Sequence, residues 1–151
     1  MKYFLWATAL FLTLIFQGYF SFFNIIPDLT IVFAFYAGLR QGDVKGLAIG
    51  AFIGAIEDSI SSMFLGPNML SKGITGFIAS HLYTKFFIWT PLIGMVSIVI
   101  FTFTDSLMVF MMKSIFDRMP TDAITGLSVI LIRSLINAPF GYFLKPREPH
   151  S

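Results

Sequence analysis

Long apolar stretches separated by short polar turns set the organisation of this chain. Asp28 is the only charge between Tyr3 and Leu39, so that stretch must hold two apolar helices with a break near Pro27. A helix of about 20 apolar residues crosses the roughly 30 Å hydrocarbon core of a bilayer. The pattern predicts six transmembrane helices, at about residues 3–22, 26–39, 45–63, 68–87, 92–112 and 123–144.

The composition places the chain among integral membrane proteins. Hydrophobic residues make up 56% and charged residues 12% of the 151, whereas about 25% of the residues in an average soluble domain are charged. We therefore expect a single all-α transmembrane domain over residues 1–151. The lack of cysteine excludes a disulfide framework and a thiolate metal site. A formal charge of +2 is too small to indicate nucleic-acid binding.

The basic residues are distributed unequally between the two sides of the predicted helices. In short loops, Lys and Arg accumulate on the cytoplasmic side of a membrane. Six spans put both termini on the side with six basic residues, against two on the other side, so both termini are expected in the cytoplasm. Five spans, the alternative, would weaken this asymmetry. The six residues are Lys2, Arg40, Lys45, Lys85, Lys145 and Arg147, and the two are Lys113 and Arg118.

Residues 45–82 form the most informative stretch, two apolar helices joined by a turn at Gly66–Pro67. At about 100° per residue, small and polar positions gather on one face of each helix. Small residues let helices approach closely, and polar groups bond across the contact. We therefore predict a packing or partner-binding seam. It comprises Gly46, Gly50, Gly54, Glu57, Asp58, Ser61, Asn68, Lys72 and Gly76.

Several charges fall inside the predicted spans, where each costs about 2.5 to 3.5 kcal/mol at the centre of a helix and needs a partner. Glu57 and Asp58 precede the first outer turn by about as many residues as Lys72 follows it, which predicts pairing there. Asp105 and Arg133 flank the second outer loop in the same way and are predicted to form a buried ion pair. Alternatively, Lys72 is only about 7 Å along its helix from the turn and could extend to the headgroups.

The sequence carries no recognisable catalytic or metal-binding motif. It has no Gly-x-Ser-x-Gly, no His-Glu-x-x-His, and His81 is the single histidine within a predicted span. Glu57 and Asp58 lie about 100° apart on their helix, which is poor geometry for carboxylates that share a proton. We expect no enzyme activity, no cofactor and no metal. A proton or solute pathway through Glu57, Asp58 and Lys72 is an alternative, because charges inside a membrane commonly mark pathways.

A series of short motifs runs in order through residues 26–82, about a third of the chain. The motifs are Ile26-Pro27-Asp28-Leu29, Arg40-Gln41-Gly42, Glu57-Asp58-Ser59, Leu65-Gly66-Pro67-Asn68, Leu70-Ser71-Lys72 and Gly76-Phe77. Together with the length and the number of spans, this series resembles the family of the rod shape-determining protein MreD. The family has an acid mainly at the second position of the Glu57-Asp58 pair. Glu57 is therefore the departure from the pattern, and its role is open.

The resemblance implies a non-catalytic scaffold in the bacterial inner membrane, within the elongasome that carries out lateral peptidoglycan synthesis and sets the rod shape. It implies an MreC-like protein as direct partner, and MreB-like filaments and rod-type peptidoglycan synthases as indirect partners. The family is also similar in fold to the substrate-binding subunits of energy-coupling-factor transporters. The alternative function is therefore a vitamin-type substrate-binding subunit. The oligomeric state is left open.

Overall fold

The computed structural model is all-α and has six helices in the part of the chain that it describes, residues 2–19, 25–61, 66–85, 89–116 and 122–145. This confirms that the fold is all-α and that it has six helices. The predicted helix ends at residues 20–22, 62–63 and 86–87 lie outside the described residues, as do Arg118 and Arg147. The helices are α1 Lys2–Tyr19, α2 Leu29–Gln41, α3 Asp43–Ile60, α4 Pro67–Lys85, α5 Pro91–Phe116 and α6 Ala123–Tyr142.

Local chemistry explains where the central helices begin. The Asp28 carboxylate caps α2 by accepting the backbone N–H of Ile31 at 3.2 Å. Gly42 alone separates α2 from α3 and has a φ of 88°, a left-handed conformation that glycine adopts without a steric cost. Pro67 and Pro91 occupy the first positions of α4 and α5, where the missing N–H has no helical partner to lose.

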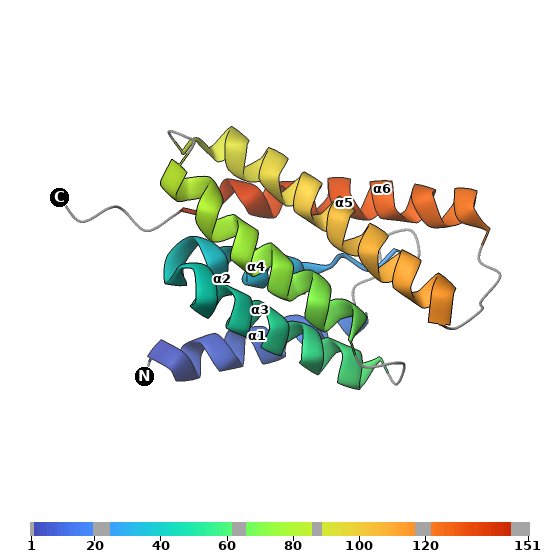
Figure 1. Cartoon of the computed structure of the whole chain (residues 1–151), viewed down its shortest axis with the longest axis horizontal. Helices are drawn as coiled ribbons and strands as arrows, with labels where there is room; N and C mark the ends of the chain where they lie inside the picture. The colour runs from blue at the N-terminus through green and yellow to red at the C-terminus, as the bar shows by residue number, and fades with distance from the viewer. Residues whose placement is uncertain (1, 20–24, 62–65, 86–88, 117–121, 146–151) are drawn as a thin grey trace.

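The short helix α2 lies at the centre of the bundle and packs against each of the other five helices. In Figure 1 the α5–α6 hairpin lies on one side of the bundle and α1 and α3 lie on the other, with α2 and α4 between them. The Phe35 ring from α2 stacks against Phe101 from α5 with the ring centroids 5.1 Å apart. The apolar core around these rings consists of Phe35, Leu39, Ala79, Ile98, Phe101 and Leu144.

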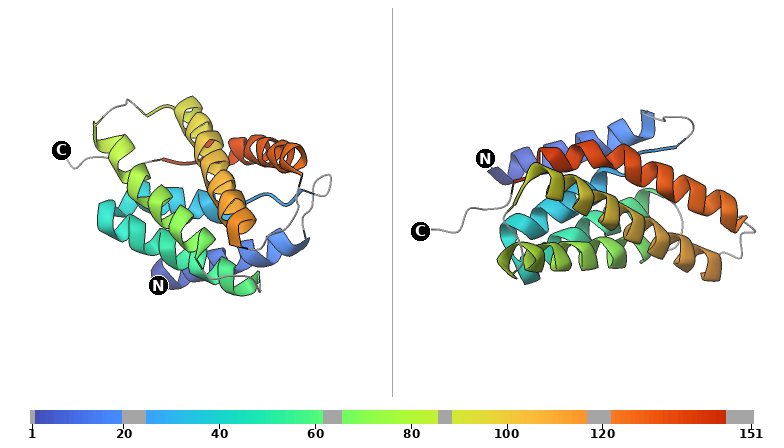
Figure 2. Two further views of the ribbon diagram at one scale, coloured as in Figure 1. Left: turned by 45° about the vertical axis from the view of Figure 1, so that its right-hand side comes forward. Right: turned by 90° about the horizontal axis from the view of Figure 1, so that it is seen from above.

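Consecutive helices run in opposite directions along the bundle. Figures 1 and 2 show the beginning of α1 and the end of α6 at the same end of the bundle, together with the junction of α2 and α3, the end of α4 and the beginning of α5. The ends of α3 and α5 and the beginnings of α4 and α6 lie at the other end. This alternation is the arrangement that the expected topology needs.

The described residues bury polar side chains and expose apolar ones. Thirteen polar or charged residues are buried, against twelve hydrophobic ones, while thirty large hydrophobic side chains are exposed. A soluble protein seldom exposes such extensive apolar surface. By length and composition, α5 and α6 are apolar enough to cross a membrane. Their most apolar windows are only 33% and 22% buried, so most of this apolar surface does not face the protein interior.

Candidate functional site

Lys72 lies at the centre of a buried polar cluster, with none of its side chain exposed. Its ammonium nitrogen is 2.9 Å from Glu57 Oε2, 3.3 Å from Asp28 Oδ2 and 3.5 Å from Asp105 Oδ2. The side-chain oxygen of Asn68 lies 3.1 Å from the same nitrogen. We call these five residues the Lys72 cluster. Burying a lone ammonium group is very unfavourable, so its acidic neighbours are what allow Lys72 to stay inside the bundle.

Four elements of the chain bring these side chains together. Asp28 precedes α2, Glu57 is on α3, Asp105 is on α5, and Asn68 and Lys72 are one turn apart on α4. The cluster therefore connects the central helix to its neighbours on both sides. Removing Lys72 would leave the charges of its acidic neighbours without compensation inside the protein.

Hydrogen bonds from Thr30 and Asn137 hold Asp28 in position. The Thr30 hydroxyl oxygen lies 2.7 Å from Asp28 Oδ1 and 2.6 Å from Glu57 Oε2. From α6, the Asn137 amide donates to the backbone carbonyl of Asp28 at 2.7 Å and to the Thr102 hydroxyl at 3.2 Å. Asn137 thereby links α6 to the segment that carries the cluster's first acid.

Asp58 has a different role from its neighbour Glu57. Its carboxylate accepts the backbone N–H groups of Gly66, Asn68 and Met69 at 2.9, 3.2 and 3.0 Å, and the Asn68 side-chain amide at 2.8 Å. These backbone groups belong to the start of α4, where the first N–H groups have no helical acceptor. Asp58 therefore caps α4 from the preceding helix, and the alternative pairing of Asp58 with Lys72 is not what the structure shows.

The predicted glycine seam is the contact between α3 and α4. A Cβ atom added to Gly46, Gly50 or Gly54 would meet a backbone carbonyl oxygen of α4, that of Gly76, Lys72 or Asn68 respectively. Side chains larger than hydrogen would force these helices apart. Ser61, in contrast, is exposed at the end of α3, where its hydroxyl donates to the Glu57 carbonyl at 2.8 Å. The seam thus packs this protein's own helices and leaves Ser61 outside the contact.

Two predictions about charges are corrected. Lys72 does not extend to a headgroup region, because its side chain is fully buried by the cluster. The Asp105–Arg133 ion pair is not present among the described residues, since Asp105 faces Lys72 instead. Arg133 is half-buried and its Nε has no hydrogen-bond partner in that part of the chain. The pair was predicted because Asp105 and Arg133 lie equally far from the loop that joins α5 to α6. Equal distance from that loop does not reveal that α4 packs against α5 and brings Lys72 close to Asp105.

Sequence reasoning missed several residues that the structure brings to the site. Asp28 is one of them, and its position as the only charge in a long apolar stretch is the signal for a buried role. Thr30 and Asn137 carry no such signal, because single polar residues on apolar helices are common. A second close contact, between Gly94 on α5 and Gly141 on α6, was also missed.

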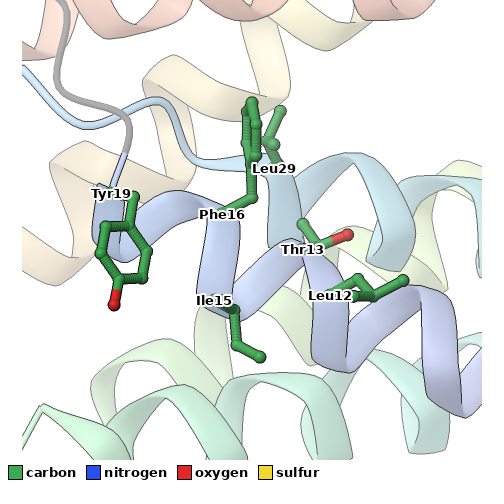
Figure 3. Close-up of a pocket in the computed structure, with 6 residues that line it drawn as sticks. All are labelled: Leu12, Thr13, Ile15, Phe16, Tyr19 and Leu29. Carbon is green, nitrogen blue, oxygen red and sulfur yellow. The ribbon is translucent and has the colours of Figure 1, made fainter.

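An apolar pocket of about 390 Å³ lies between α1 and the start of α2. Figure 3 shows its side chains, among which Thr13 donates its hydroxyl to the Ala9 carbonyl at 2.7 Å. The lining carries no charged group that would select a polar ligand. It consists of Leu12, Thr13, Ile15, Phe16, Tyr19 and Leu29.

The cluster's chemistry is that of ion pairing. The ammonium group of Lys72 occupies the space between the three carboxylates. Within the described residues, no group of three or more histidine or acidic side chains is arranged to hold a metal ion.

No protein-family model, curated protein or solved structure matches this chain. The family resemblance therefore rests on the sequence motifs alone.

Proposed function

We propose that this protein is a six-span, non-catalytic scaffold of the bacterial inner membrane, of the MreD type, acting in lateral peptidoglycan synthesis. The observation that carries the proposal is the position of the motif residues. Asp28, Asp58, Asn68 and Lys72 belong to the motifs of the family resemblance, and they make one connected buried network. Residues that form the buried interior help to determine the fold, so a protein that shares these motifs is expected to share the fold as well.

The distribution of apolar surface supports a membrane location. Thirty exposed large hydrophobic side chains would be unfavourable in water, at roughly 25 cal/mol per Å² of apolar surface. These side chains are favourable against lipid. The polar residues, which lipid cannot hydrogen-bond, are buried inside the bundle and find their partners there. The alternating helix directions fit six crossings with both termini in the cytoplasm.

The short connections favour contacts made by the helices themselves. They range from one residue between α2 and α3 to nine between α1 and α2, too few for a folded recognition module. A single-span protein such as an MreC-like partner would then pack on the exposed apolar surface. The polar groups of the cluster are engaged with one another, which suits a structural role better than catalysis.

Reporter fusions test the topology of this proposal. Fusions after Lys45, Lys85 and Lys145 are expected to report the cytoplasm, and a fusion near Gly66 the outside. A fusion after Lys45 that reports the outside contradicts the six-span arrangement, whichever partner the protein has.

Purification in mild detergent tests the function. We expect an MreC-like protein to co-purify, and cells depleted of the protein to become round. The matched variants are Gly50→Leu, which enlarges the seam, and Ala48→Leu, which adds similar bulk at an exposed position of the same helix. Because Gly50 lies in the internal α3–α4 contact, Gly50→Leu should lower the yield of folded protein and the co-purifying partner with it, whereas Ala48→Leu should keep both. Purification with a vitamin-like ligand at one-to-one stoichiometry, without an MreC-like protein, would favour the transporter subunit instead.

A further inference from the structure

Thr30 lies between two carboxylates at distances that a single hydroxyl proton does not explain. Its oxygen is 2.7 Å from Asp28 Oδ1 and 2.6 Å from Glu57 Oε2, both within the usual range for O–H···O hydrogen bonds. A hydroxyl has one proton to donate, and an ionised carboxylate only accepts. If both acids were ionised, one of these short contacts would join two oxygens with no proton between them.

The surroundings of Lys72 also indicate that one of the acids carries a proton. Its ammonium has three protons but four oxygen neighbours, from Asp28, Glu57, Asn68 and Asp105. Three ionised carboxylates around one ammonium would leave two negative charges uncompensated inside the bundle. A proton on one of the three acids would remove one of these two charges.

We propose that the Lys72 cluster is a proton-binding site, in which Glu57 carries a proton and donates it to Thr30. Thr30 then donates its own proton to Asp28, so both short contacts are hydrogen bonds. The proton also removes one of the two negative charges that Lys72 leaves uncompensated. Loss of the proton would return a negative charge to the centre of the bundle.

Glu57 is the acid that fits this role best. Asp28 Oδ1 already accepts the Ile31 N–H, so it is placed as an acceptor. Asp105 Oδ1 has no hydrogen-bond partner among the described residues, so a proton on that oxygen would have no acceptor there. Glu57 has its acceptor in Thr30, and its side chain is 23% exposed, which gives the proton a way to exchange.

The charged groups that face Glu57 come from every neighbouring element. They are Asp28 ahead of α2, Lys72 on α4 and Asp105 on α5. Asp58 is next in sequence but is turned to the start of α4. The site therefore depends on the cluster alone and does not require an MreC-like partner.

Infrared spectroscopy of the purified full-length protein tests the proposal. At neutral pH we expect the carbonyl band of one protonated carboxylic acid per chain, shifted in heavy water and lost on raising the pH. The band should disappear in Glu57→Gln and persist in Asp43→Asn, an exposed acid outside the cluster. Absence of the band from the wild type, or its retention in Glu57→Gln, would overturn the assignment.

Thermal unfolding gives an independent measurement. The glutamine amide can donate to Thr30 as a protonated Glu57 does, so Glu57→Gln should lower the midpoint by less than about 4 °C at neutral pH. Thr30→Val, which removes the bridging hydroxyl, should shift the infrared band, and Thr30→Ser should restore it. A large loss of stability in Glu57→Gln would mean that Glu57 is ionised and would count against the proton.

Discussion

The two outer hairpins, α3–α4 and α5–α6, look alike in sequence but are built differently. Each is a pair of apolar helices with glycine contacts and with an acid and a base at matching depth. In α3–α4, three glycines of one helix touch the backbone of the other, and Asp58 caps the helix that follows. In α5–α6, the glycine contact between the two backbones joins Gly94 to Gly141, and the Asp122 side chain at the start of α6 makes no capping bond.

The charges separate the hairpins further. Lys72 of the first hairpin collects acids from α2, α3 and α5, whereas Arg133 of the second has no acid within ion-pair distance in the described chain. The acid of the α5–α6 hairpin, Asp105, contacts Lys72 of the α3–α4 hairpin. The difference shows that a buried charge pairs with the nearest helix in space, which need not be the next helix in sequence.

The largest effect is expected from removing the shared cation. Lys72→Met should destabilise the protein by about 3–5 kcal/mol, because it leaves several buried carboxylates without the ammonium. The measurement is the yield and unfolding midpoint of the purified protein. Lys45→Met, at an exposed position, should change stability by no more than about 0.5 kcal/mol. Equal effects of the two substitutions would show that Lys72 does not hold the cluster.

Enlarging the α3–α4 seam should have the next largest effect. Gly50→Leu should cost about 1–3 kcal/mol or more, because even a Cβ would meet the Lys72 carbonyl oxygen. Unfolding midpoints of Gly50→Leu and of the exposed control Ala48→Leu check this. Gly94→Leu extends the test to the other hairpin, where a Cβ would meet the Gly141 carbonyl oxygen. A tolerated Gly50→Leu would contradict the close α3–α4 contact.

The caps of the two hairpins offer a smaller contrast. Asp58→Ala should cost about 1–3 kcal/mol, since it leaves N–H groups at the start of α4 without an acceptor. Asp122→Ala should have little effect, because Asp122 is exposed and caps no backbone N–H. Denaturant unfolding in detergent compares the two. A larger loss from Asp122→Ala would mean that the hairpin assignments are reversed.

The finest test is the coupling between charges. A double-mutant cycle with Asp105→Asn and Lys72→Met should give an interaction energy of about 0.5–3 kcal/mol. The corresponding cycle with Asp105→Asn and Arg133→Gln should give less, because these side chains form no ion pair in the described structure. If the second interaction energy exceeds the first, Asp105 forms its ion pair with Arg133 and not with Lys72.

The sequence by itself determined the helices and the faces that they bury. Apolar run length, the prolines at helix starts and the glycine spacing predicted six helices and the α3–α4 seam, since these depend on interactions within one helix or between neighbours in sequence. The buried position of Gly46, Gly50 and Gly54 follows from their period along α3.

Only the tertiary structure decided which buried groups meet. Asp28 and Asp105 are 44 and 33 residues from Lys72 in sequence, yet both lie within 3.5 Å of its ammonium nitrogen. That meeting depends on α2 lying at the centre and on α5 crossing α4, and helix periodicity does not encode either. A buried charge takes the partner that folding brings nearest, because in a low dielectric environment the cost of remaining unpaired exceeds any preference set by local sequence.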